Sequence, residues 1–297
     1  MTSHEERILE LLNTSKIDGN DTNSVDFQGI VWSSITKKIS SKEFLNIDFS
    51  HGDFRRVTIH NSKFTNCQFH KAKAKGLILT GSDFTGCTFE GCDFSQSKFN
   101  ERSKGNLGSF VNCSFKEVNF KNAHTQSPLI SHTQFLHCNF KRFDFDGARL
   151  MDCQFEGTVE ETWFRPQSAR STGKWFSDFF FNPFHYENKM ENIDFSHSTL
   201  NGVSFLGGID LTKTLFPEGK EYILVKNPFE VYTNAKKVAS KAMEEPDLAI
   251  SIINTLYLGR VTPSQSLDFI DSNVLAGMED IHTKVFELIR EVIQQAK

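Results

Sequence analysis

A period of five residues runs through the middle of this chain and limits the folds it can adopt. Large, mostly apolar residues recur at every fifth position from Phe44 to Phe99 and again, shifted by one residue, from Phe110 to Phe155. Sixteen of these 22 positions are phenylalanine. An α-helix repeats every 3.6 residues and a strand every two, so neither element alone has this period. The pattern predicts a solenoid, in which short units bury their apolar side chains only by stacking on neighbouring units.

A second periodic position lies two residues before each large residue and usually carries a small side chain. All six cysteines of the chain occupy it. The other three residues of each five are mostly polar, so we expect two side chains of every five to point inward. The predicted core comprises Phe64, Phe69, Phe84, Phe89, Phe94, Phe99, Phe110, Phe115, Phe120, Phe135, Phe140, Phe145 and Phe155 with Cys67, Cys87, Cys92, Cys113, Cys138 and Cys153.

Segments such as Ser82-Asp83-Phe84-Thr85-Gly86 and Cys92-Asp93-Phe94-Ser95-Gln96 resemble the pentapeptide-repeat family, whose consensus is A(D/N)LXX with Leu or Phe at its centre. The resemblance covers residues 44–155 and returns between Ile193 and Phe205. It implies a mainly β fold, a right-handed quadrilateral β-solenoid with four repeats in each coil. Coils of this kind stack at about the strand spacing of ~4.8 Å.

The segments outside the repeats predict a cap at each end of the solenoid. Residues 1–43 form an N-terminal cap with a short helix over residues 3–13, residues 44–216 form the solenoid, and residues 227–297 form a C-terminal α-helical bundle. Four helices are expected in the bundle, starting near Asn227, Pro246, Thr262 and Ile281, from their capping residues and apolar periodicity.

Residues 156–191 interrupt the repeat, and we expect them to form its largest insertion. Aromatic rings and arginines crowd this segment, a composition typical of interface hot spots. The candidate partner-binding residues are Trp163, Phe164, Arg165, Trp175, Phe176, Phe180 and Phe181. The alternative is that these rings pack back on the solenoid or cover its join with the helical bundle. A membrane-touching loop is a third interpretation, which the acidic residues among the rings disfavour.

No motif for catalysis or metal binding stands out in the sequence. It lacks a phosphate-binding glycine loop, His-Glu-x-x-His, Gly-x-Ser-x-Gly and Cys-x-x-Cys. A disulfide or metal site is a minor alternative, because a twenty-residue coil stacks Cys67 on Cys87, and Cys92 aligns with Cys113 if one residue loops out. His51, His60, His70, His132 and His137 fall on outward positions. We therefore expect no enzyme, no cofactor and no metal.

The preferred function is a non-catalytic protein-binding scaffold. We expect it to be cytoplasmic, since no apolar run is long enough to span a membrane. Some members of the family resemble DNA in shape and charge and bind the type II topoisomerase gyrase, as quinolone-resistance proteins do, so a DNA mimic is the alternative function. Residues 44–155, however, hold 14 Lys or Arg and 10 Asp or Glu, a net charge of +4, whereas a DNA mimic needs an ordered negative face.

Two further interactions stay open from the sequence. Direct nucleic-acid binding could use Lys71, Lys73 and Lys75 with Arg55 and Arg56, although such a patch is more often a solvated face. The amphipathic helix expected at 281–294 is a candidate for pairing with its own copy in a homodimer.

Overall fold

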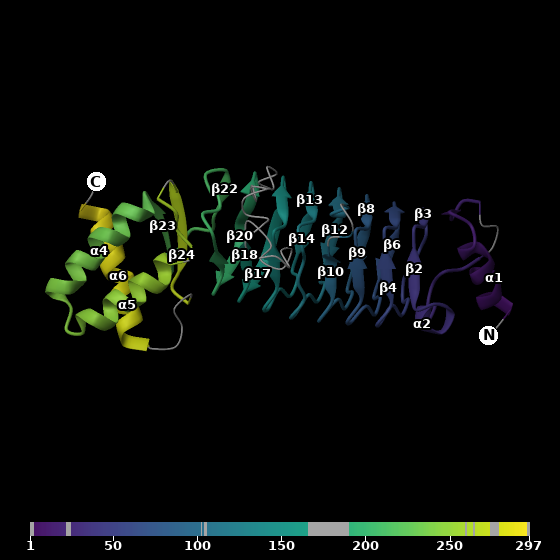
Figure 1. Cartoon of the computed structure of the whole chain (residues 1–297), viewed down its shortest axis with the longest axis horizontal. Coiled ribbons are helices and arrows are strands. Elements are labelled where there is room, and N and C mark those ends of the chain that lie inside the picture. The colour runs from purple at the N-terminus through teal and green to yellow at the C-terminus, as the bar shows by residue number, and fades with distance from the viewer. Residues whose placement is uncertain are drawn as a thin grey trace, which may run out of the picture.

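The computed structural model describes residues 3–21, 25–101, 103, 106–165, 190–258, 260–263, 265–273 and 279–295. The molecule is elongated, with stacked strands between two helical ends (Figure 1). Helices α1 (Ser3–Leu12) and α2 (Trp32–Ile35) lie at the N-terminal end, and α4 (Pro228–Ala242), α5 (Pro246–Tyr257) and α6 (Glu279–Gln295) lie at the other. The predicted β-solenoid with helical ends is confirmed.

The solenoid has four walls, and the strands of each wall pair in parallel from one coil to the next. The first wall contains β1 (Lys16–Asp18), β3 (Glu43–Leu45), β5 (Lys63–Thr65), β8 (Asp83–Thr85), β11 (Ser109–Val111), β13 (Leu129–Ser131), β16 (Arg149–Met151) and β19 (Met190–Glu191). The second contains β6 (Gln68–His70), β9 (Thr88–Glu90), β12 (Ser114–Lys116), β14 (Gln134–Leu136), β17 (Gln154–Glu160), β20 (Ile193–Asn201) and β22 (Thr214–Leu215).

The third wall is built from single bridges in its first coils, and they run through Val31, Asp53, Lys73, Asp93, Asn119 and Asn139. Its last coils are formed by the C-terminal halves of β17 and β20, which pair from Gly157 to Glu160. The fourth wall contains β2 (Lys38–Ser40), β4 (Thr58–His60), β7 (Ile78–Thr80), β10 (Lys98–Glu101), β15 (Asp144–Asp146), β18 (Trp163–Arg165) and β21 (Ser204–Phe205). A bridge through His124 joins β10 to β15. The middle residue of nearly every wall segment is buried, as the period of five predicts.

Corners of the coils require left-handed backbone, and the sequence supplies residues that tolerate it. The residue two after a central residue has positive φ in nearly every repeat, as at Asn46 (52°), Asn66 (53°) and Asn112 (53°). Asparagine and glycine adopt this conformation at low cost. The Asn46 amide also donates to the Asp18 carboxylate one coil below at 3.1 Å, so the corner side chains form part of the stack.

The phase shift in the sequence arises from an inserted loop between two coils. Phe84 pairs with Phe110, 26 residues later instead of 20, so the loop adds six residues rather than one. The buried amide of Asn100 accepts a hydrogen bond from the Ser82 backbone N–H at 2.9 Å and donates one to the Ser82 carbonyl at 2.7 Å. An amide side chain thus replaces backbone pairing where the ladder is interrupted.

The predicted insertion is shorter than the sequence indicated, and its first ten residues belong to the solenoid. Strand β17 continues to Glu160, and β18 pairs with β15 below and β21 above. The prediction of a break at residue 156 was wrong, because Phe164 stands 19 residues after Phe145 and so falls off the five-residue grid. Residues 166–189 lie outside the described part of the chain.

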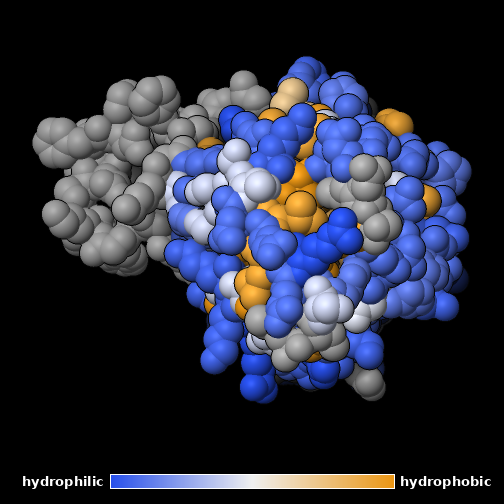
Figure 2. Space-filling view, turned by 90° about the vertical axis from the view of Figure 1, so that its right-hand side faces the viewer, coloured by the Kyte–Doolittle hydropathy of each residue, from blue (hydrophilic) through white to orange (hydrophobic). Residues whose placement is uncertain are grey.

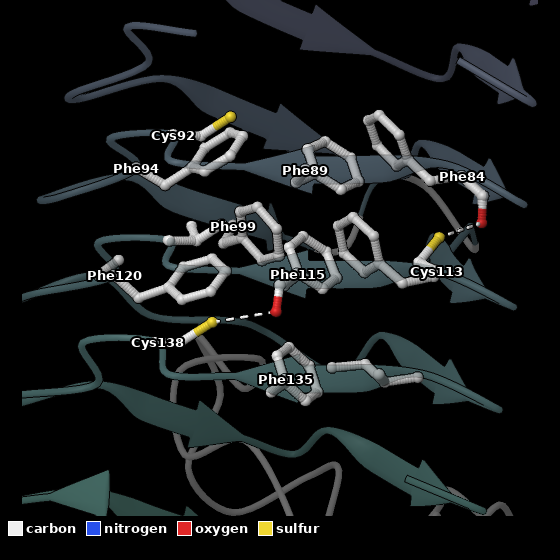
Figure 3. Packing of buried hydrophobic residues seen from close by; sticks show 14 of the residues in the cluster. Phe84, Phe89, Cys92, Phe94, Phe99, Cys113, Phe115, Phe120, Phe135 and Cys138 are labelled. Carbon is white, nitrogen blue, oxygen red and sulfur yellow. Dashed lines mark hydrogen bonds between the residues drawn. The ribbon is translucent and has the colours of Figure 1, made fainter. Parts of the chain in front are cut away.

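Stacked phenylalanine rings form most of the solenoid core (Figure 3). On the second wall the ring centroids of Phe69, Phe89 and Phe115 follow one another at 4.7 and 4.5 Å with nearly parallel planes. Neighbouring walls meet edge to face, as Phe115 and Phe120 do at 5.5 Å. Both arrangements suit the charge distribution of aromatic rings. Every phenylalanine and cysteine in the predicted core set is buried.

The cysteines are free thiols with a structural role. Each Sγ donates to a carbonyl one coil below, for example Cys92 to Phe69 at 3.1 Å and Cys138 to Phe115 at 3.3 Å. Thr133 fills an equivalent position with the same kind of bond, to the Phe110 carbonyl. The predicted alignment of Cys92 with Cys113 was wrong. Cys113 stacks on Cys87, as the neighbouring strand register requires, because the inserted loop adds six residues.

We predict that these thiols are unreactive while the solenoid is folded. Burial raises the pKa of Cys92, Cys138 and Cys153 to about 12, so almost none of each is thiolate at pH 8. A chromogenic disulfide reagent at pH 8 should modify none of the six thiols in the native protein and all six in denaturant. A thiol of the native protein that reacts at the rate of free cysteine would contradict this burial.

Ala74 leaves a packing defect in the core. It occupies a central position of the third wall, where the coils on either side place Phe54 and Phe94, and a small apolar void lies beside it. We expect Ala74→Val to stabilise the protein by about 1 kcal/mol, since two added methyl-sized groups gain about 0.8 kcal/mol each before strain is subtracted. The control is Ala148→Val, in a slot that stacks on Pro128, which should destabilise. Chemical unfolding measures both, and a loss at Ala74 equal to that at Ala148 would contradict the prediction.

The N-terminal cap helix covers the first coil and leaves part of its own apolar surface exposed. Ile8 of α1 is fully buried, while Leu11 and Leu12 are only partly buried against the same core. Figure 2 looks onto this end of the molecule and shows apolar surface surrounded by hydrophilic residues. Trp32 stacks on Phe54 at 5.4 Å, so the ring ladder begins before residue 44.

The C-terminal unit contains three of the four predicted helices. Residues Leu267–Asp271, predicted as part of a helix, form strand β24, which pairs antiparallel with β23 (Tyr222–Lys226). The helix prediction was wrong because this strand is buried on both faces and so lacks the polar alternation of a surface strand. Phe269 joins the solenoid core and Ile270 joins the core of the helices.

The two-stranded sheet β23–β24 attaches the helices to the last coil. Phe269 stacks on Phe216 at 4.3 Å and extends the ring ladder beyond the solenoid. The buried Asp271 carboxylate accepts hydrogen bonds from the backbone N–H groups of Gly202 and Val203 at 2.9 and 3.0 Å. Apolar stacking and directional polar contacts together fix this join.

The predicted homodimer through helix 281–294 loses its basis in the structure. Val285 and Ile289 of α6 are fully buried, and Phe286 and Val292 are at most 7% exposed. These side chains belong to the core that α6 shares with α4 and α5. The apolar face that the sequence offered for pairing is therefore occupied within the chain.

Candidate interaction surface

The interior of the solenoid is filled by side chains, so its outer walls carry any interaction. Histidines predicted to face outward lie on these walls beside carboxylates of the next coil. The pairs are His70 with Glu90 at 3.6 Å, His132 with Asp152 at 3.5 Å and His137 with Glu156 at 3.1 Å. Each histidine thus has a neighbour along the stack. No three His, Cys, Asp or Glu side chains converge on a metal-sized site within the described residues.

An open polar groove follows the corner between the first and second walls. Its lining residues are Thr88, Asn112, Cys113, Ser114, His132, Gln134, Asp152 and Gln154. The Gln134 amide donates to Gln154 at 3.4 Å, and His132 faces Asp152. These side chains pair along the solenoid axis, so the groove does not gather polar groups around one point.

The third wall concentrates positive charge. Within residues 44–155, this wall and its corners comprise residues 51–56, 71–76, 91–96, 117–122 and 137–142, in which eight Lys or Arg face two Asp and one Glu, a net charge of +5. Since residues 44–155 together have a net charge of +4, the rest of that stretch has a net charge of −1. The eight cations are Arg55, Arg56, Lys71, Lys73, Lys75, Lys121, Lys141 and Arg142.

Three of these cations are neutralised by neighbouring carboxylates. Arg55 chelates Asp53, and its side-chain hydrogen bonds lower the pKa of that carboxyl. Lys141 contacts Glu160 at 2.9 Å, and Arg142 contacts Glu161 at 2.8 Å. These pairs fix side chains at both ends of the wall.

The remaining five cations have no salt bridge within the part of the chain that the structure describes, and we call them the cation patch. The patch consists of Arg56, Lys71, Lys73, Lys75 and Lys121, all exposed. Lys73 stands between Asp53 and Asp93 in the bridge ladder, so neighbouring coils partly balance its charge. The Asp93 carboxylate already accepts bonds from the Ser95 backbone N–H and the Asn119 amide. The patch is the largest uncompensated charge that we find on the described walls.

Acidic residues of the other walls are mixed with cations. Glu90 accepts a salt bridge from Lys116 at 2.7 Å, and Glu43 accepts one from Lys63 at 3.3 Å. The Lys116 hydrogen bond lowers the pKa of Glu90. Continuous negative charge of the kind a DNA mimic needs is not formed by the described residues of these walls.

The structure separates the candidate partner-binding residues. Phe164 is fully buried and stacks on Phe145 and Phe205 at 4.7 and 5.0 Å, so its assignment to an exposed binding loop was wrong. Trp163 and Arg165 flank it on the outer side of the fourth wall. Arg165 lies 3.2 Å from the Asp144 carboxylate. The other candidates, Trp175, Phe176, Phe180 and Phe181, lie outside the described residues.

Sequence reasoning found five of the eight cations of the basic wall. The spacing of twenty residues placed Arg55 and Lys75 on one face, but Lys121 follows Ser95 by 26 residues because of the inserted loop. The backbone bond from Gln96 to the Lys121 carbonyl shows the true register. Counting the extra residues between Phe99 and Phe110 as one complete repeat plus one would have placed Lys121 on the same wall.

Comparisons with known proteins identify the repeat. A family model of pentapeptide repeats matches residues 62–100 in eight copies. No curated protein sequence matches the chain. No helix among the described residues is long and apolar enough to cross a membrane.

Solved structures with a similar fold come from several sources. A trypsin-treated form of QnrB1, a plasmid-mediated fluoroquinolone resistance protein, is 18% identical and covers 57% of this chain and 75% of its own, with a TM-score of 0.31. Rfr23 from the cyanobacterium Cyanothece 51142 is 7% identical over 40% of this chain and 92% of its own, with a TM-score of 0.29. HetL from the cyanobacterium Nostoc sp., involved in heterocyst differentiation regulation, is 13% identical over 65% of this chain and 85% of its own, with a TM-score of 0.27.

Proposed function

The chain is a pentapeptide-repeat protein, and we propose that it is a non-catalytic binding module whose solenoid engages a macromolecular partner through an outer wall. The observation that supports this most is the filled interior, in which stacked rings occupy the space that an active-site cavity would need. Function must then reside on the surface, and the walls offer long, flat areas with fixed side-chain spacing.

Rigidity suits the solenoid to this role. Each wall segment pairs with the coils below and above it, and rings stack behind it. A surface held in this way loses little conformational entropy on binding, which favours affinity. We also propose that the protein works in the cytoplasm, where its six reduced thiols are stable.

A photo-crosslinking residue on each wall tests the proposal. We would place it singly at Thr85 on the first wall, Gln68 on the second, Asn139 on the third and Lys98 on the fourth. A binding module should give one dominant crosslinked macromolecule, captured from one wall or two adjacent walls of the intact protein in cell extract. Capture of the same mixture from all four walls, or of nothing from any of them, would overturn the proposal.

The fourth wall offers a secondary contact next to the insertion. Trp163 is partly exposed there, and Trp and Arg are the residues that most often anchor protein interfaces. We propose that Trp163 and Arg165 contribute contacts if the partner binds this wall. Trp163→Ala should then reduce capture from the Lys98 position and leave capture from Thr85 unchanged.

A DNA mimic that binds gyrase requires an ordered negative face in place of phosphates. The described walls do not favour this alternative, since the third wall is basic and acids such as Glu90 and Glu156 have cationic or histidine neighbours. Gyrase subunits captured from the first or second wall, but not from the third, would replace our proposal with this function.

A further inference from the structure

We propose that the cation patch binds an extended acidic segment of a partner protein, with carboxylates at alternating positions of that segment. The inference rests on the proposed function as a binding module and names the wall and the chemistry of the partner. The wall is the third, and the ligand groups are Asp or Glu side chains.

Spacing along the chain supports an extended ligand. Lys71, Lys73 and Lys75 point outward, while Ala72 and Ala74 between them are buried. Alternate residues of an extended chain are about 6.6–6.8 Å apart. Lys71 stands at a left-handed corner (φ 52°) and Lys75 lies in the turn that follows the bridge at Lys73, so the three lysines follow the outer bend of the wall. Carboxylates spaced along one face of an extended segment can each face a different cation of the patch.

Stacking of the coils widens the patch along the solenoid axis. Arg56 lies one coil below Gly76, next to Lys75, and Lys121 lies two coils above Lys75 in the same outward column. At ~4.8 Å for each coil, Lys121 is about 10 Å from the Lys75 position. Further acidic residues of the same segment can therefore reach Arg56 or Lys121.

Unpaired charge makes the patch available to a ligand. Arg56, Lys71, Lys75 and Lys121 have no carboxylate within salt-bridge distance among the described residues, whereas lysines such as Lys63 and Lys116 on other walls have one. Like charges at this separation repel each other weakly in water. An acidic ligand removes that repulsion and gains the attraction of several cations at once.

Two observations favour an acidic protein over a nucleic acid. The rings of the third wall, including Phe54, Phe94 and Phe120, are at most 3% exposed, so the described wall has no platform on which bases can stack. The whole chain has a net charge of −4 and a pI near 6.2, unlike domains that bind nucleic acid mainly through phosphates. The patch is local and matches a short segment.

Peptide binding to the full chain tests the inference. The probe is a fluorescein-labelled 12-residue peptide of alternating Glu and Thr, followed by fluorescence anisotropy at about 50 mM salt. The patch variant carries Arg56→Gln, Lys71→Gln, Lys75→Gln and Lys121→Gln, and glutamine suits the left-handed corner positions because Gln96 occupies one (φ 59°). We expect the patch variant to bind at least tenfold more weakly than the native chain.

A matched control separates the patch from bulk charge. Lys38→Gln, Lys63→Gln, Lys98→Gln and Lys116→Gln remove the same charge from the other walls, and affinity should stay within about twofold of native. A peptide with the same composition but its glutamates in one block should bind several-fold more weakly than the alternating peptide. Equal loss in both variants, equal binding of both peptides, or tighter patch-dependent binding of a 12-base-pair duplex DNA would each overturn the inference.

Wall-specific crosslinking distinguishes failure of this inference from failure of the proposed function. A partner captured from the first, second or fourth wall, and retained by the patch variant, would overturn the acidic-segment inference but leave the binding module intact. A partner captured from Asn139 on the third wall and lost in the patch variant would support both.

Discussion

Replacing Arg260 with alanine is expected to lower the stability of the C-terminal unit by about 3–5 kcal/mol. Arg260 is 3% exposed, and its guanidinium donates to the fully buried Asp268 carboxylate at 3.3 Å and to the Phe269 carbonyl at 2.6 Å. The Tyr232 hydroxyl donates to the other Asp268 oxygen at 2.7 Å. Removing the guanidinium leaves a buried carboxylate with a neutral donor only.

In that variant the Tyr232 phenol does not give up its proton to Asp268. Burial raises the pKa of Tyr232 well above its ordinary value, so the hydroxyl keeps its proton at neutral pH and remains a donor to Asp268. The fully buried Asp268 carboxylate can then replace the guanidinium only by admitting water, and that change costs part of the stability.

Denaturant unfolding followed by circular dichroism at 222 nm measures this effect, because α4, α5 and α6 provide most of the helical signal. Lys284→Ala is the control, since Lys284 and Glu244 form an exposed pair at 3.2 Å that should contribute less than about 1 kcal/mol. The combined variant Arg260→Met, Asp268→Leu and Tyr232→Phe should recover most of the loss, as apolar replacements of buried ion pairs often do. A single-variant loss no larger than that of Lys284→Ala would show that Asp268 is solvated.

The period of five residues was enough to predict the walls, because the same two positions of each repeat point inward. Phe84, Phe89 and Phe94 are buried and their neighbours Asp83 and Thr88 face outward, as the pattern indicated. The residue types within each repeat determine this alternation, and the adjacent coils have the same pattern.

Departures from the repeat could not be predicted, because they depend on contacts between coils. Thr125 occupies a central position that normally holds a large residue, and Phe143, at a position that is usually small, contributes a ring in the coil above and contacts Phe120 and Phe140 at 5.5 Å. The sequence shows a small residue in one slot and a large one in another, eighteen residues apart. Only the coil register shows that they compensate each other.

The basic wall illustrates the same limit at the candidate site. Lys71, Lys73 and Lys75 are visible as a cluster in the sequence. The register decides which residues lie beside them in the neighbouring coils, and Lys121 joins them only after the inserted loop is counted. Strand β24 was missed for a related reason. Its two buried faces belong to two different cores, and no pattern within five residues shows that.

Phe115→Ala is expected to be the most damaging single change within the solenoid, with a loss of about 3–5 kcal/mol. Phe115 is fully buried and stacks on Phe89 at 4.5 Å and on Phe135 at 5.2 Å. Its edge contacts with Phe110 and Phe120, at 5.6 and 5.5 Å, connect it to both adjacent walls. Truncation removes a ring from the middle of the stack, where neighbouring rings cannot move together without breaking their strand pairing.

The location of the damage should be as informative as its size. In a solenoid each coil is stabilised mainly by its neighbours, so a weakened interface lets the structure open on either side of it. Hydrogen exchange should lose protection first in the backbone N–H groups of β9, β12 and β14, while β3 and β20 keep theirs. The control is Phe229→Ala, whose ring is 43% exposed and should cost less than about 1 kcal/mol. Uniform loss of protection along the whole chain would instead mean that the coils unfold as one unit, and an equal cost at Phe115 and Phe229 would mean that ring stacking does not hold the walls together.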